Sequence, residues 1–66
     1  MEVVSYINGV ITYRGYEYQY ESYEKVDDNC VHILMGGGVY ALTAGNTVIN
    51  NIVCNSSDEI ITIFES

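Results

Sequence analysis

The chain contains no proline, no tryptophan, one histidine, one phenylalanine and only two cysteines among its 66 residues. Two cysteines allow at most one disulfide, far below the density of a disulfide-stabilised scaffold. Cys30 and Cys54 are therefore expected to be reduced, half-buried thiols. No apolar run approaches the roughly 20 residues of a membrane helix, and Met1 to Tyr6 lacks the basic segment of a signal peptide. The sequence predicts a cytoplasmic protein that does not contact a membrane.

Positive charge is also scarce. Arg14 and Lys25 stand against nine acidic residues, giving a net charge of −7. Neutralising phosphates requires lysine and arginine, so this charge disfavours direct binding of nucleic acid and favours a partner protein with a basic surface. A chain of this length forms one domain (1–66) with a small core. The hydrophobic content of 48% argues against disorder.

The strongest local signal is Asn8-Gly9, which suits the two positive-φ positions of a type I′ hairpin turn. A two-residue loop there sets the register of the flanking strands and puts Val4, Tyr6, Ile11 and Tyr13 on one face. That face is the expected core face, because the polar Ser5 and Thr12 pair on the other. Arg14-Gly15 is then expected to bend or bulge the chain.

The next segment, Tyr16 to Glu21, alternates strictly between aromatic and polar residues, which indicates a half-buried strand. A bulge is expected at Ser22-Tyr23, where the alternation slips, and a turn at Asp27-Asp28-Asn29. Strands are predicted at Cys30–Met35, Val39–Thr43 and Glu59–Phe64, with turns at Gly36-Gly37-Gly38, Ala44-Gly45-Asn46 and Asn55–Asp58. The segment 47–54 is ambiguous: its apolar spacing is helical, but its Thr, Val and Ile residues favour a strand kinked at Asn50-Asn51.

These elements predict an all-β fold, a small antiparallel meander of five to six short strands forming a barrel or roll, with a short helix near 47–54 as the alternative for that segment. A sheet this small leaves edge strands open, and open edges pair with other chains. Self-association as a homodimer or higher oligomer is therefore expected.

The residues that carry chemistry are few, and none forms a convincing catalytic or metal-binding motif. Cys30 and His32 share a strand face, but they lie roughly 6.8 Å apart along the strand, too far for a direct hydrogen bond. Asp27, Asp28 and Cys54 complete a set of metal-ligand types that lacks the paired spacings of zinc sites and the pattern of a calcium loop. Gly36 to Gly38 has no lysine nearby for an anion site. We therefore expect no enzymatic activity, no metal and no cofactor.

The segment Tyr16 to Asp28 contains more aromatic and acidic residues than folding alone needs. Tyrosine suits protein interfaces because it brings a large apolar body and a polar tip, and Tyr18 and Tyr23 are the expected exposed anchors. The equal alternative is that the tyrosines form the core wall of a small barrel while the acids face water. The sequence predicts a non-enzymatic protein-binding module that inhibits or regulates a partner, such as an anti-defence inhibitor of a phage or mobile element. The alternatives are a nucleic-acid mimic that occupies a basic groove and a self-associating structural subunit. The predicted partner-binding residues are Tyr16, Glu17, Tyr18, Tyr20, Glu21, Tyr23, Glu24, Asp27 and Asp28.

Overall fold

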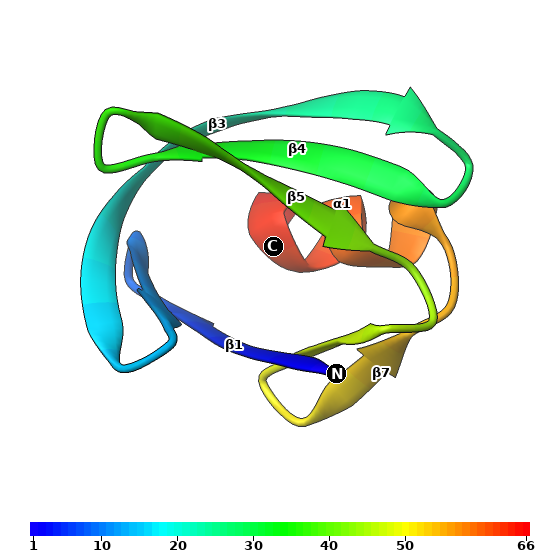
Figure 1. Cartoon of the computed structure of the whole chain (residues 1–66), viewed down its shortest axis with the longest axis horizontal. Helices are drawn as coiled ribbons and strands as arrows, with labels where there is room; N and C mark the ends of the chain where they lie inside the picture. The colour runs from blue at the N-terminus through cyan, green and yellow to red at the C-terminus, as the bar shows by residue number, and fades with distance from the viewer.

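A computed structural model describes all 66 residues as one curled β-sheet with a single helix (Figure 1). The elements in chain order are β1 (Glu2–Ile7), β2 (Val10–Tyr13), β3 (Tyr16–Asp27), β4 (Cys30–Met35), β5 (Gly38–Thr43), β6 (Thr47–Ile49), β7 (Ile52–Cys54) and α1 (Ser57–Glu65). The strands lie in the order β5-β4-β3-β2-β1-β6-β7. The fold is all-β, as predicted, and its one short helix lies at Ser57–Glu65 instead of near 47–54. The sheet is not closed into a barrel, since β5 and β7 remain its two edges.

The first hairpin follows the predicted register. Val4 pairs with Tyr13 and Ile7 with Val10, and the turn residues Asn8 and Gly9 have φ of 52° and 80°. Such values at both central residues fit a type I′ turn. The prediction for Arg14-Gly15 was wrong: this pair, with φ of 52° and 83°, is a second two-residue turn that joins β2 to β3. A positive φ is uncommon for arginine, so Arg14-Gly15 is a weaker turn signal than Asn8-Gly9.

Strand β3 connects the two halves of the sheet. Its first part, Tyr16 to Gln19, pairs with β2, and the part from Tyr20 to Asp27 pairs with β4. The register shifts between Tyr20 and Ser22 and again between Lys25 and Asp27. The first shift lies one residue before the bulge expected at Ser22-Tyr23. Bulges increase the local twist and bend of a strand, so β3 can belong to both halves.

The last third of the chain departs from the predicted meander. The segment 47–54 is not a helix but two strands joined at Asn50-Asn51, where the kink was expected, which raises the strand number to seven. Strand β6 returns across the sheet and pairs in parallel with β1, Val3 lying opposite Val48. No local sequence signal specifies this long-range pairing, which is why an entirely antiparallel sheet was expected.

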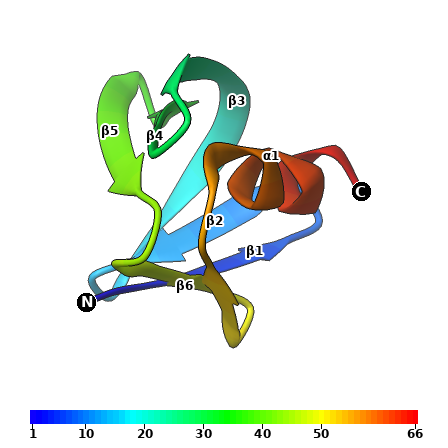
Figure 2. The same ribbon diagram turned by 90° about the vertical axis from the view of Figure 1, so that its right-hand side faces the viewer.

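The predicted final strand Glu59–Phe64 is also wrong, because these residues lie in α1. Ser56 caps the helix by accepting a hydrogen bond from the Glu59 amide, and Ile60 and Phe64, one turn apart, are both buried. Isoleucine and threonine are weak helix formers, but the tertiary contacts of this apolar face outweigh that preference. Figure 2 shows α1 against the concave side of the curled sheet.

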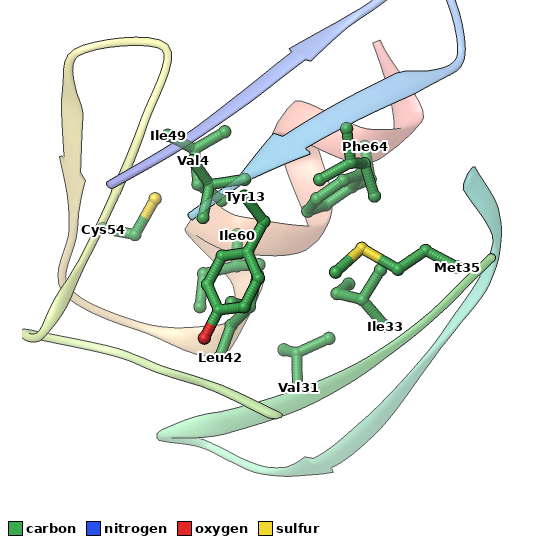
Figure 3. Close-up of a cluster of buried hydrophobic side chains, with 11 residues drawn as sticks. Val4, Tyr13, Val31, Ile33, Met35, Leu42, Ile49, Cys54, Ile60 and Phe64 are labelled. Atoms are coloured by element: carbon green, nitrogen blue, oxygen red, sulfur yellow. The ribbon is translucent and has the colours of Figure 1, made fainter. Parts of the chain in front are cut away.

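The core lies between the concave face of the sheet and α1 (Figure 3). Both halves of the sheet contribute alternate residues to it, as the predicted alternation in β1, β2 and β4 requires. The strictest alternation is in β4, where Val31, Ile33 and Met35 are at most 2% exposed. The buried hydrophobic residues are Val4, Ile11, Tyr13, Val31, Ile33, Met35, Leu42, Ile49, Cys54, Ile60 and Phe64.

Candidate functional site

The acidic side chains of β3 and the following turn form two groups, one on the outer face of the strand and one at the β3–β4 turn. Glu17 and Glu24 are exposed, and their pairing partners are Thr12 on β2 and His32 on β4. Neither carboxylate is in an ion pair, because Lys25 and Arg14 pair with other acids. Glu21, at the first bulge, is exposed and accepts a hydrogen bond of 3.0 Å from the Gly37 amide. Glu17 and Glu24 are therefore the least engaged carboxylates of the predicted site.

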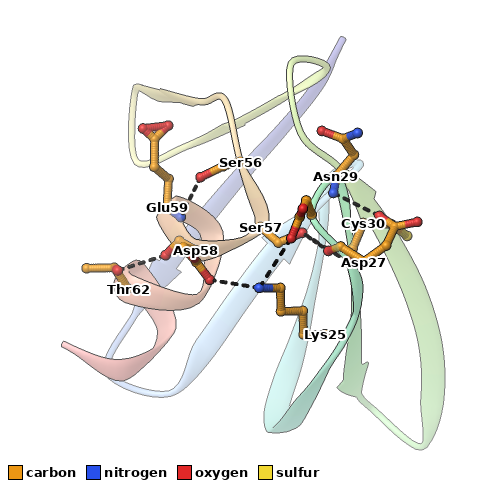
Figure 4. Close-up of polar contacts among 10 residues, drawn as sticks. Lys25, Asp27, Asn29, Cys30, Ser56, Ser57, Asp58, Glu59 and Thr62 are labelled. Atoms are coloured by element: carbon orange, nitrogen blue, oxygen red, sulfur yellow. Dashed lines mark hydrogen bonds and ion pairs between the residues drawn. The ribbon is translucent and has the colours of Figure 1, made fainter.

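The β3–β4 turn contacts the start of α1 (Figure 4). Asp27 accepts a hydrogen bond of 2.8 Å from the Asn29 amide, and its main-chain carbonyl accepts one from the Ser57 hydroxyl. Lys25 lies between two carboxylates, 3.2 Å from Asp58 and 3.6 Å from Asp28. The hydrogen bond to Asp58 and the charge of that carboxylate raise the pKa of Lys25. The Asp28 and Asp58 carboxylates thus share the single positive charge of Lys25.

Three of the four tyrosines of the predicted site, Tyr18, Tyr20 and Tyr23, pack against the core on the opposite, concave side of β3. Tyr20 packs between Tyr6 and Phe64, with ring centroids 5.2 Å from each. Tyr18 and Tyr23 are half-buried, so the expectation that they are exposed anchors was wrong. Only Tyr16, which is 69% exposed, stands free in solvent. The strand therefore presents acids on its outer face and one exposed tyrosine at its start.

The two half-buried tyrosines have specific partners. The Tyr23 hydroxyl donates a hydrogen bond of 2.6 Å to Glu65 at the end of α1, and this bond raises the pKa of Tyr23. The Tyr18 ring lies 5.5 Å from that of Tyr40, whose hydroxyl raises the pKa of Tyr18. The Tyr18 ring also covers Gly36, where an added Cβ would lie 2.7 Å from the Tyr18 Cδ1 atom. These contacts give Tyr18 and Tyr23 structural roles.

Helix α1 adds acidic residues that the sequence reasoning did not include. Asp58, Glu59 and Glu65 are exposed on α1, and the contacts Lys25–Asp58 and Tyr23–Glu65 hold the helix beside the second half of β3. The sequence does contain a signal for the start of this helix, since Ser56 followed three residues later by Glu59 fits a capping box. In the structure the Glu59 carboxylate accepts a hydrogen bond from the Asn55 amide.

The acidic residues are concentrated on three neighbouring parts of the chain. Eight of the nine acids lie on β3, its turn and α1, and the ninth, Glu2, pairs with Arg14 at 2.8 Å. The Arg14 contact lowers the pKa of Glu2. No Asp, Glu, Lys or Arg occurs between Asn29 and Ser57. We call the eight residues the acidic surface: Glu17, Glu21, Glu24, Asp27, Asp28, Asp58, Glu59 and Glu65.

Other reactive side chains are dispersed. Cys30 and Cys54 are both free, Cys54 is fully buried, and burial raises the pKa of its thiol. No group of three or more His, Cys, Asp and Glu side chains is placed to hold a metal ion. The helix α1 lacks the length and apolar character needed to cross a bilayer.

A groove of about 390 Å³ lies on the outer face of β1 and β2, beside the Asn50-Asn51 turn. Its floor includes Val3 and Ile7, which are 67% and 62% exposed. These residues belong to the face that the first hairpin pattern assigned to solvent.

Comparison of the chain with known protein families, curated proteins and solved structures finds no match.

Proposed function

We propose that this chain is a non-catalytic protein-binding module whose acidic surface binds the basic surface of a partner protein and thereby inhibits or regulates it. The observation that supports this proposal is the charge distribution: eight of nine acids lie on β3, its turn and α1. The one cation among them, Lys25, is neutralised by Asp28 and Asp58. An excess of charge of one sign on a small protein attracts partners of opposite charge and speeds their association.

The size of the module favours inhibition by occupation of a site. The chain measures only about 25 × 22 × 21 Å and offers no cluster of groups that resembles a catalytic site. A folded body of this size covers a partner surface without needing to change shape. An inhibitor of host defence encoded by a phage or mobile element remains our preferred biological setting, because small acidic proteins without catalytic groups are frequent among such inhibitors.

Mimicry of nucleic acid is the second candidate, and the arrangement of β3 favours it. Glu17 and Glu21 lie four positions apart on β3, roughly 13.6 Å along the strand, or four times the axial spacing of about 3.4 Å between phosphates of one DNA strand. Glu17 and Glu24 lie on the outer side of one strand, and Asp27 and Asp28 continue the charge to the turn. A partner of this kind has a nucleic-acid-binding groove, so DNA or RNA must compete with the chain for it.

The test starts with the immobilised chain as bait in lysate of its native host, followed by calorimetry with each retained protein. We expect a partner with a basic patch whose affinity falls as salt rises. The double variant Glu17→Gln/Glu24→Gln should bind roughly tenfold more weakly, since two exposed charges at about 0.7 kcal/mol each amount to about 1.4 kcal/mol. Glu2→Gln is the control, because it removes one charge outside the acidic surface.

Two outcomes contradict the proposal, and two further results distinguish the kinds of interface. If Glu2→Gln weakens binding by half as many kcal/mol as the double variant, each lost charge has the same effect wherever it lies, which indicates an effect of net charge alone and contradicts a specific acidic surface. Unchanged affinity in the double variant, with the fold intact, also contradicts it. If Tyr16 is an interface anchor, Tyr16→Ala should cost about 2 kcal/mol of binding. Displacement of the partner by DNA or RNA supports mimicry over general inhibition.

A further inference from the structure

Both edges of the sheet come from a part of the chain that carries no residue with a full charge at neutral pH. The segment from Asn29 to Ser57 contains no Asp, Glu, Lys or Arg, and it forms β4, β5, β6 and β7. The sheet ends at β5 on one side and β7 on the other. In a protein with a net charge of −7, a second copy meets the least local repulsion at an uncharged edge.

Strand β5 presents the longer open edge. Gly36 and Gly37 form a two-residue turn, so Met35 and Gly38 are a hydrogen-bonded pair and the pairing alternates from there. Val39, opposite Leu34, and Ala41, opposite His32, are then non-hydrogen-bonded pairs. Their main-chain N–H and C=O groups point away from β4 toward the open side.

Nothing else in the protein satisfies these four groups. None of the nine main-chain hydrogen bonds outside the ladders involves Val39 or Ala41. Strand β5 is the last strand on its side of the sheet, and Figure 2 places it at the margin of the molecule. The other edge, β7, has only three residues and one outward-facing position, Val53.

Strand β5 also lacks the features that normally block an open edge. Natural edges are protected by lysine, proline, bulges or inward-pointing charges. Strand β5 has none of these: its sequence is GVYALT, it pairs with β4 without a register shift, and its outer side chain Val39 is 60% exposed.

We propose that β5 is a dimerisation edge on which the β5 strand of a second copy pairs in antiparallel orientation. The twofold axis passes beside Tyr40, so that Val39 of each copy faces Ala41 of the other. Because Val39 and Ala41 have outward-facing main-chain groups, each facing pair exchanges two hydrogen bonds. Four hydrogen bonds then join two sheets into one of fourteen strands (two copies of the seven).

A second copy fits this edge better than a basic partner, on grounds of charge. A twofold interface must be self-complementary, and β5 meets only its own uncharged sequence. Strand β3 of one copy lies five strand spacings of about 4.8 Å from β3 of the other, on the order of 24 Å and about three Debye lengths at 0.15 M salt. A basic partner is attracted instead to the acidic surface. The inference is thus independent of the proposed function.

The experiment is sedimentation equilibrium of the wild-type chain and two matched lysine variants, at concentrations up to about the millimolar range that weak interfaces require. We expect the wild type to reach twice its 7.4 kDa mass, with dimerisation slightly strengthened by salt. Val39→Lys should remain monomeric. Val3→Lys should dimerise like the wild type, because Val3 is similarly exposed but lies on an internal strand.

Amide hydrogen exchange locates the interface without any substitution. The amides of Val39 and Ala41 should exchange more slowly as protein concentration rises, whereas that of Val53 should not change. A wild type that stays monomeric overturns the proposal, and so does a dimer that Val39→Lys leaves intact. Concentration-dependent protection at Val53 instead of Val39 and Ala41 also overturns it and assigns dimerisation to β7.

Discussion

The side chain of Asn50 fastens the β6–β7 turn to β1, and its removal tests the parallel pairing of the sheet. The Asn50 side chain accepts a hydrogen bond of 2.8 Å from the Tyr6 amide and donates one of 3.0 Å to the Tyr6 carbonyl. It thereby continues the pairing of β1 beyond the end of β6, as a third strand residue would. The Asn50 amide itself donates to the Val4 carbonyl at 3.0 Å.

We expect Asn50→Gly to destabilise the protein by about 1–2 kcal/mol. Each hydrogen bond contributes about 0.5–1.5 kcal/mol net, and the exposed Tyr6 groups regain water, so the lower half of the 1–3 kcal/mol range applies. Glycine is chosen because Asn50 has φ of 51°, a conformation that alanine would strain. For a domain of this size the loss lowers Tm by about 5–15 °C.

The matched control is Asn51→Gly. Asn51 also has a left-handed backbone, with φ of 67°, but takes no part in the two bonds to Tyr6. The change in unfolded-state entropy is common to both variants, so the difference between their unfolding free energies measures the side-chain bonds alone. Thermal and urea unfolding followed by circular dichroism give both values. Equal stability of the two glycine variants would refute the assigned role of Asn50.

Two further perturbations address the helix and the tyrosines. Ile60→Ala, at a fully buried position of α1, should lower the free energy of unfolding by about 2–5 kcal/mol. Ile61→Ala, at the half-buried neighbouring position, should lower it clearly less. Equal losses of stability in urea unfolding would contradict the assigned helix face. Glu65 raises the pKa of Tyr23, and burial raises that of Tyr20, above the ordinary value of 10.0. Neutral tyrosines therefore stabilise the fold below that pH, and this stability is lost as pH rises through the folded-state values. Urea midpoints should fall over that range, and less steeply in Tyr23→Phe; an unchanged slope in that variant would contradict the Tyr23–Glu65 bond.

The sequence was most informative where short-range chemistry determines geometry. Asn8-Gly9 accounts for the register of the first hairpin, and the alternation Val31, Ile33, Met35 identifies the buried face of β4, because both depend on neighbouring residues only. The β-branched residues Ile60 to Ile63 were misread as a strand because their burial against the sheet, a tertiary effect, decides their conformation.

The candidate site was predictable only in part, for the same reason. The acids of Tyr16–Asp28 were recognisable from composition, and Tyr16 is exposed at the start of β3. Which tyrosines are available depends on partners remote in sequence, such as Glu65 for Tyr23 and Tyr40 for Tyr18. The contribution of α1 to the acidic surface likewise requires knowing that Asp58 meets Lys25.

The parallel pairing of β1 with β6 also constrains the order in which the chain acquires structure. The five strands from β1 to β5 are joined by two-residue turns and pair with their neighbours in sequence, so they close small loops quickly. The Asn50–Tyr6 contact joins residues 44 positions apart. Because closing so long a loop costs more entropy, this contact forms after the pairing of β1 to β5. During synthesis the first hairpin leaves the ribosome long before β6, the second strand that pairs with β1, has been made. Until residues 47–54 and α1 emerge, the chain carries an unfinished β1 edge and an uncovered concave face, which makes this the interval in which misassembly is most to be expected.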